Sequence, residues 1–206
     1  MKKKFKKVLI IIAIIIILLV GIFVAFKFLG KKPDKPINVI DEISGYSYSL
    51  EDRDSQLFKD TFLKLKDVLS AQDIDYEEYA KVLAQLYIID LYTMDNKVSK
   101  YDVGSFEFVY PDYVDSFKLK ATETMYKSVE NNVNGKRKQE LPKVTNVYVT
   151  NIEESTFEIG EDEYTSYVIA LNWDYKKDLG YDKEAQITAI KSDKYIYIVE
   201  QGEIEE

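Results

Sequence analysis

The chain contains neither cysteine nor histidine among its 206 residues. Without these residue types it can form no disulfide, no Ser-His-Asp or Cys-His nucleophile system, and no thiolate or imidazole metal site. A lipoprotein is excluded as well, since lipid attachment needs a cysteine. We therefore expect a domain held together by packing alone, without enzymatic activity, metal or cofactor.

Acidic residues outnumber basic ones outside the N-terminal stretch. The first thirty residues hold six of the 28 basic residues and none of the 36 acidic ones, which leaves 22 against 36 and a net charge of −14 beyond them. Phosphate contacts need Lys and Arg. We therefore expect no nucleic-acid partner. Lys136-Arg137-Lys138 is the one cationic patch in this part, and a solvated loop or a contact with an acidic partner would explain it.

Charge is missing altogether from most of Val8–Leu29, which is an almost unbroken apolar run. A helix rises about 1.5 Å per residue, so this run is long enough to cross a bilayer core of about 30 Å. Five lysines precede it, at positions 2, 3, 4, 6 and 7. They predict a cytoplasmic N-terminus and a single-pass protein of the cell membrane whose C-terminal domain is extracytoplasmic. A cleaved signal peptide is the alternative, but no small-x-small site follows the run.

The rest of the chain divides into a spacer and one domain. The boundaries that we predict are a basic cytoplasmic tail over 1–7, a transmembrane helix over 8–29, a linker over 30–50 and an α+β domain over 51–206. Pro33 and Pro36 favour an extended spacer. The remaining length suits one domain of ordinary size.

Helical periodicity comes first in this domain. Apolar residues at helical spacing predict a helix from Asp54 to about Ser70. Asp75 with Glu78 resembles a capping box and predicts a second helix to about Met94. A third helix is predicted from Pro111 into the stop signal at 131–135, with Val114, Phe117, Ala121 and Met125 as its apolar stripe.

Alternating patterns follow and continue to the end. The strands that they predict are Val144–Asn151, Thr156–Ile159, Tyr164–Tyr175, Glu184–Lys191 and Lys194–Glu200, with one more short strand at Phe106–Phe108. Short links between strands require antiparallel pairing. The predicted fold class is α+β: a single N-terminal transmembrane helix, then about three helices packed on a curved antiparallel sheet of four to five strands.

Tyrosine is unusually abundant, with 17 residues. Its apolar body and polar tip suit pockets and interfaces as well as cores. In the longest predicted strand Tyr167, Leu171, Trp173 and Tyr175 share one face. We take these four as a possible ligand pocket or interface, with core packing as the alternative.

Carboxylate motifs give weaker signals. The stretch from Asp73 begins like a calcium loop but lacks its glycine and its final glutamate, so it is interpreted as a helix start. The acidic turn at 160–163 is typical of a solvated hairpin tip, with loose cation binding as the alternative. Glu153 and Glu154 face opposite sides of a strand and cannot act together.

The order of these elements resembles a known fold. Residues 79–94, 106–132 and 144–199 follow the order of the nuclear-transport-factor-2-like cone fold. The chain resembles in particular the single-span assembly factor of type IV secretion and conjugation systems. That resemblance implies a self-associating scaffold that contacts other proteins without catalysis, in a fold that also hosts small-molecule binders and a few enzymes.

Three functions follow as hypotheses. The first is a membrane-anchored extracytoplasmic scaffold or interaction module of a cell-envelope complex, linked to secretion or conjugation. Its partners would be the lipid bilayer, proteins of a membrane complex and further copies of the chain. The second is an extracytoplasmic domain that binds or senses a small apolar or aromatic ligand. The third is a hydrolase of envelope glycan that uses two facing carboxylates.

Overall fold

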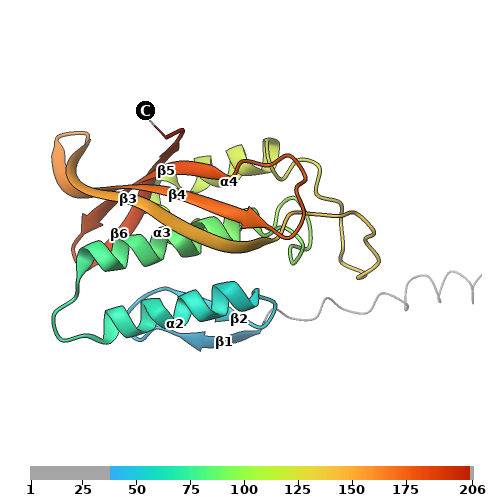
Figure 1. The fold of residues 1–206 in the computed structure, drawn as a ribbon, viewed down its shortest axis with the longest axis horizontal. Coiled ribbons are helices and arrows are strands. Elements are labelled where there is room, and N and C mark those ends of the chain that lie inside the picture. The colour runs from blue at the N-terminus through green and yellow to red at the C-terminus, as the bar shows by residue number, and fades with distance from the viewer. Residues whose placement is uncertain (1–37, 205–206) are drawn as a thin grey trace, which may run out of the picture. The chain divides into compact units, whose positions relative to one another are not determined.

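The computed structural model describes residues 38–204, which form an α+β arrangement (Figure 1). A small hairpin comes first, then helices, then the main sheet. The elements in chain order are β1 (Val39–Glu42), β2 (Ser49–Glu51), α2 (Gln56–Ser70), α3 (Tyr76–Tyr92), η1 (Phe106–Phe108), η2 (Pro111–Tyr113), α4 (Val114–Glu123), β3 (Val144–Ile159), β4 (Asp162–Tyr175), β5 (Glu184–Ser192) and β6 (Tyr195–Gly202).

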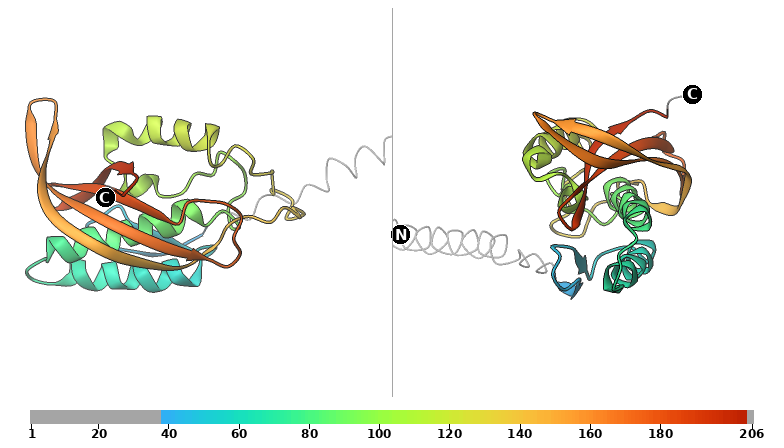
Figure 2. Two further views of the ribbon diagram at one scale, coloured as in Figure 1. Left: turned by 45° about the horizontal axis from the view of Figure 1, so that its top comes forward. Right: turned by 90° about the vertical axis from the view of Figure 1, so that its left-hand side faces the viewer.

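The main sheet is an antiparallel meander in the order β3-β4-β5-β6. The two predicted strands around 144–159 are one long strand, β3. Register shifts interrupt its pairing with β4 between Val144 and Asn146 and between Val149 and Asn151. Such irregularities bend a strand. The tip of the β3–β4 hairpin, where the pairing is regular, curls away from α3 (Figures 1 and 2).

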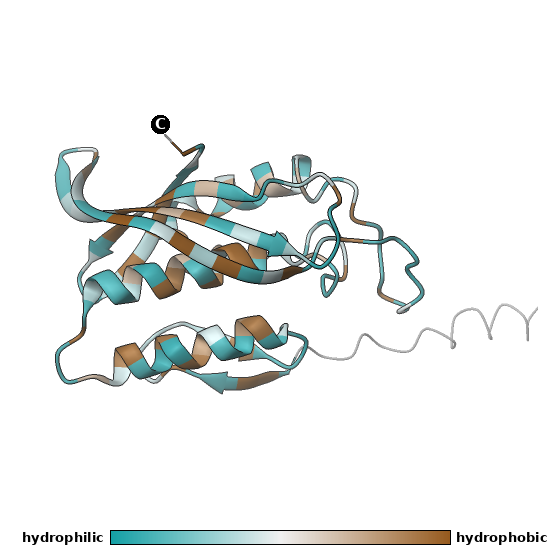
Figure 3. Ribbon diagram, in the orientation of Figure 1, coloured by the Kyte–Doolittle hydropathy of each residue, from teal (hydrophilic) through white to brown (hydrophobic). Residues whose placement is uncertain are grey.

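Helix α3 is the centre of the core. It lies between α2 and the sheet (Figure 1) and is buried on almost all sides, because both neighbours need an apolar surface to pack against. Figure 3 shows hydrophobic residues along α3 and the strands that face it. Its start follows the predicted cap, since the Asp75 carboxylate accepts the Glu78 N–H at 3.0 Å.

Residues 39–51, which include the second half of the predicted linker, form the β1–β2 hairpin. Ile43, Tyr48 and Leu50 are buried there. The hydroxyl of Tyr48 lies 2.5 Å from that of Tyr79 on α3. This stretch therefore contributes side chains to the core of the domain.

The strand predicted at Phe106–Phe108 is wrong, since these residues form the 3₁₀ helix η1. Ser105 before it adopts a left-handed conformation, with φ 65°, and donates its N–H to the Asp90 carboxylate of α3. That contact turns the chain, so Phe108 enters the core while Phe106 faces out beneath Lys118.

The third helix is shorter than the sequence pattern predicts. It ends at Glu123, and Tyr126 then inserts its ring fully into the core. The Tyr126 hydroxyl donates to the carbonyl of Leu91 at 2.7 Å and accepts the N–H of Gly104 at 3.4 Å. Burying this ring requires the chain to leave the helical path.

The predicted membrane-spanning helix, and with it the predicted single-pass membrane location, is corrected. No helix within 38–204 is long and apolar enough to cross a membrane. The longest, α3, has 17 residues, about 25 Å of helix, and packs inside the domain. The run Val8–Leu29 lies outside the described residues, as do the basic tail and the first part of the linker. Function is therefore inferred from residues 38–204.

Candidate functional site

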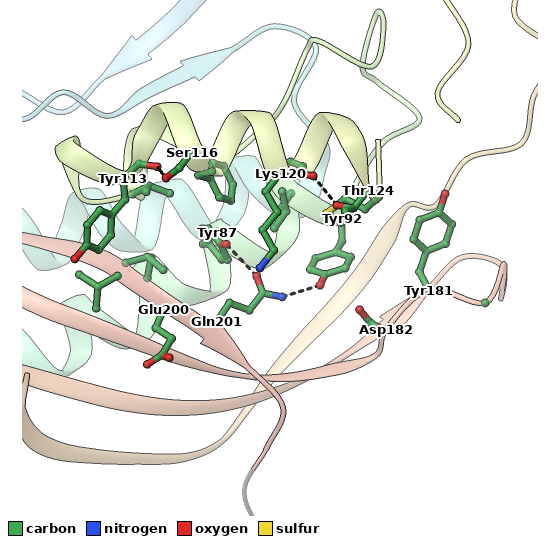
Figure 4. A pocket seen from close by; sticks show the side chains of 18 residues that line it. Tyr87, Tyr92, Tyr113, Ser116, Lys120, Thr124, Tyr181, Asp182, Glu200 and Gln201 are labelled. Carbon is green, nitrogen blue, oxygen red and sulfur yellow. Dashed lines mark hydrogen bonds between the residues drawn. The ribbon is translucent and has the colours of Figure 1, made fainter. Parts of the chain in front are cut away.

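A cavity of about 600 Å³ lies between α3, α4, the end of β6 and the loop before β5 (Figure 4). Figure 4 shows α4 along one side and β6 along the other. Most of the lining is aromatic or aliphatic. The lining residues are Tyr87, Leu91, Tyr92, Val109, Tyr113, Ser116, Phe117, Lys120, Ala121, Thr124, Met125, Gly180, Tyr181, Asp182, Ile198, Val199, Glu200 and Gln201.

The apolar wall formed by α4 and the turn after it is the stripe that the sequence predicts for the third helix. Phe117, Ala121 and Met125 recur at helical spacing, and all three line the cavity. Phe117 also meets Tyr87 of α3, with ring centroids 6.0 Å apart. Helix α4 therefore touches α3 through this pair and leaves an open space beside it.

The polar end of the cavity is the side chain of Gln201 held between two tyrosines. Tyr87 donates its hydroxyl to Gln201 Oε1 at 2.9 Å, and Gln201 Nε2 donates to the Tyr92 hydroxyl at 2.8 Å (Figure 4). These two bonds fix the orientation of the amide. They join the last strand to the central helix at the floor of the cavity.

Both tyrosines remain neutral in this setting. Burial raises the pKa of Tyr92 to about 12, against the opposing hydrogen bond from Gln201. Burial likewise raises the pKa of Tyr87, with a smaller contribution from Tyr92. Neutral phenols can both donate and accept hydrogen bonds. The two tyrosines can therefore hydrogen-bond a polar group of a ligand although they carry no charge.

Charged groups lie around the mouth. Figure 4 shows Lys120 extending from α4 toward Gln201, the Glu200 carboxylate pointing away from Lys120, and Asp182 on the side of Tyr181. Asp182 is near enough to contribute to the raised pKa of Tyr92. The one cation and the two carboxylates are thus on different sides of the opening.

The four residues that the sequence selects lie elsewhere. Tyr167, Leu171 and Trp173 are buried in the core and Tyr175 is half-buried. None of the four is a lining residue of the cavity. Trp173 nevertheless packs against Tyr92, with ring centroids 4.7 Å apart. The single tryptophan therefore contacts a residue that lines the cavity.

Sequence reasoning missed the residues that do form the site. Tyr87 and Tyr92 lie on a helix interpreted as core, and Gln201 lies one residue past the predicted end of the last strand. The available signal was the predicted apolar stripe of Phe117, Ala121 and Met125. Whether other side chains fully cover such a stripe depends on the distance between α4 and the elements that face it. The periodicity of apolar residues does not specify that distance.

Carboxylates gather at a second place, beneath η1. Glu51, Asp54, Asp90, Asp102 and Glu107 line a cavity of only about 90 Å³, together with Arg53 and Lys97. Arg53 makes a bidentate pair with Asp102, and Lys97 pairs with Asp90. Ligand pockets usually measure about 300–1,000 Å³, so this space suits a few water molecules and no glycan.

Burial controls the titration of two carboxylates in this cluster. It raises the pKa of Glu107 to about 8, helped by the charge of Asp90, and raises the pKa of Asp54 to about 6. Over residues 38–204, no group of three or more acidic side chains is arranged to hold a metal ion. The acidic turn after β3, at 160–163, is exposed. The cluster under η1 is best described as a partly buried ionic network that joins β2, the loop before α2, α3 and η1.

Comparison of the chain with family models, curated proteins and solved structures gives no match. The resemblance to the cone fold of nuclear transport factor 2 therefore stays a prediction. The site is assigned from its own geometry.

Proposed function

We propose that residues 38–204 form a binding domain for a small apolar or aromatic ligand, which occupies the cavity between α3, α4 and β6. The observation that carries this proposal is the cavity itself, of about 600 Å³ with aromatic walls and one hydrogen-bonded polar end. Its volume lies within the usual range of ligand sites, about 300–1,000 Å³.

The composition of the site agrees with binding in the absence of catalysis. Its walls supply apolar contact area, and its polar end supplies neutral hydrogen-bonding groups in fixed positions. Tyr87, Leu91 and Tyr92 belong to the buried central helix, so this wall is already in place before a ligand arrives. A preformed site loses little conformational entropy on binding.

The test uses the full chain with two neutral probes, 1-octanol and 2-phenylethanol. Trp173 is the only tryptophan and touches Tyr92, so its fluorescence reports on the cavity. We expect a change in that fluorescence and a higher melting temperature with at least one probe.

Ala121→Phe places a ring in the cavity, whereas Leu119→Phe adds a ring to the exposed side of the same helix. The first variant should lose the response and the second should keep it. Met125→Phe replaces Ala121→Phe if that variant does not fold. The proposal is wrong if neither probe changes the fluorescence or the melting temperature. It is also wrong if the variant with a ring in the cavity responds as strongly as the wild type.

A second candidate function, an interaction module that self-associates, has one specific observation in its favour. Within the described residues β1 pairs with β2 alone, and its Val39 and Ile40 side chains are about half exposed, at 50% and 54%. Exposed apolar edge strands pair readily with other strands. Sedimentation of the full chain tests this, since Ile40→Lys should weaken association and Leu119→Lys should not. A wild-type monomer at every concentration excludes the candidate.

A further inference from the structure

At the floor of the cavity there are more hydrogen-bond donor hydrogens than acceptors to receive them. The Gln201 amide nitrogen carries two hydrogens, and Tyr92 accepts one of them. Tyr92 accepts this bond and keeps its own hydroxyl hydrogen. Among residues 38–204 neither remaining hydrogen has an acceptor. The floor therefore offers two unused donors to a ligand.

Lys120, an exposed lysine at the mouth, adds a positive charge to the same cavity. Its side chain extends from α4 toward Gln201 (Figure 4). No carboxylate of the described residues lies within ion-pair distance of its ammonium group. Glu200 points away from it and Asp182 lies on the side of Tyr181 (Figure 4). The cation thus lines the same cavity as the two unused donors, and no described carboxylate pairs with it.

We infer that the ligand of this cavity is a small monocarboxylate with an apolar body, whose carboxylate lies between Lys120, Gln201 and the hydroxyl of Tyr92. This inference rests on the proposed function. A carboxylate accepts several hydrogen bonds and carries the charge that Lys120 lacks. The body then lies along Phe117, Ala121 and Met125, where the wall is apolar.

Three probes with the same chain and different heads test this at pH 7: octanoate, octanamide and octylammonium. All are transparent where tryptophan is excited, so Trp173 fluorescence and calorimetry can both be used. We expect the full chain to bind octanoate roughly tenfold more tightly than octanamide, the size of one charge-assisted hydrogen bond. Octylammonium should bind more weakly than octanamide.

Lys120→Met keeps the apolar stem and removes the charge. It should lower the affinity for octanoate by roughly tenfold and so abolish the preference for octanoate over octanamide. Lys127→Met, on an exposed lysine of the same segment outside the lining, is the matched control and should keep the preference.

The outcomes separate the two proposals. One result is that octanamide binds the wild type but not Ala121→Phe, while octanoate binds no more tightly than octanamide. That result contradicts the inference of a carboxylate ligand and supports the proposed binding function. The carboxylate inference is also wrong if the wild type prefers octylammonium, or if Lys120→Met still prefers octanoate to octanamide. If none of the three probes binds, both proposals fail.

Discussion

Trp173 on β4 and Tyr92 on α3 are in contact, with ring centroids 4.7 Å apart and an interplanar angle of 42°. Tyr92 presents its other side to the cavity. The contact connects the core of the sheet to the site. A change in the surroundings of the Tyr92 hydroxyl should therefore alter the fluorescence of Trp173.

Tyr92→Phe removes the acceptor of the Gln201 amide. One net hydrogen bond is worth about 1 kcal/mol, so the free energy of unfolding should fall by about that amount. Urea unfolding followed by Trp173 fluorescence measures it. Tyr181→Phe is the control, since Tyr181 lines the same cavity and its hydroxyl makes no bond within 38–204. An equal loss in both variants contradicts the role of the hydroxyl.

Glu107 should make the domain less stable as pH rises. Burial raises its pKa to about 8, above the ordinary value of about 4.3 in an unfolded chain. The folded state then holds a proton that the unfolded state has released, so the contribution is complete below about pH 4.3 and is lost as pH rises through about 8. The expected loss is on the order of 3 kcal/mol, allowing for partial exposure.

Glu107→Gln imitates the protonated form and should flatten this pH dependence. Unfolding free energies of the variant and the wild type, measured between pH 5 and 9, give the comparison. The exposed Glu158→Gln is the control and should follow the wild type. Parallel curves for Glu107→Gln and the wild type mean that Glu107 ionises in the folded state as it does in water.

Tyr126→Phe leaves two backbone groups without a partner. The hydroxyl serves the Leu91 carbonyl and the Gly104 N–H, both in the interior. An unsatisfied buried polar group costs about 1–3 kcal/mol, so a loss of about 2 kcal/mol is expected in chemical denaturation. Tyr101→Phe, at a ring that is 75% exposed, should cost almost nothing.

Gly104→Ala tests the close approach of η1 to α3. A Cβ at position 104 would lie 2.6 Å from the carbonyl oxygen and a carboxylate oxygen of Asp90. Overpacking of this kind costs about 1–3 kcal/mol. Gly202→Ala has nothing within 4 Å and serves as the control. Thermal unfolding compares them, and equal melting temperatures would show that Asp90 yields without cost.

The sequence by itself determined part of the local structure, namely the strands after residue 144 and the start of α3. The alternating pattern after residue 144 predicts the strands, and Asp75 predicts the start of α3, because strand pleat and helix capping depend on residues close together in the chain. The missing cysteines and histidines also exclude whole classes of chemistry without any coordinates.

Only the tertiary structure decided where the site lies. Tyr167 and Trp173 have the composition of a pocket, yet α3 covers their strand face and makes them core. Phe117, Ala121 and Met125 have the pattern of core, yet α4 lies far enough from β6 to leave a cavity. Periodicity states which face of an element is apolar. The distance to the element that faces it depends on contacts between distant parts of the chain, and that distance decides whether the face is packed or open.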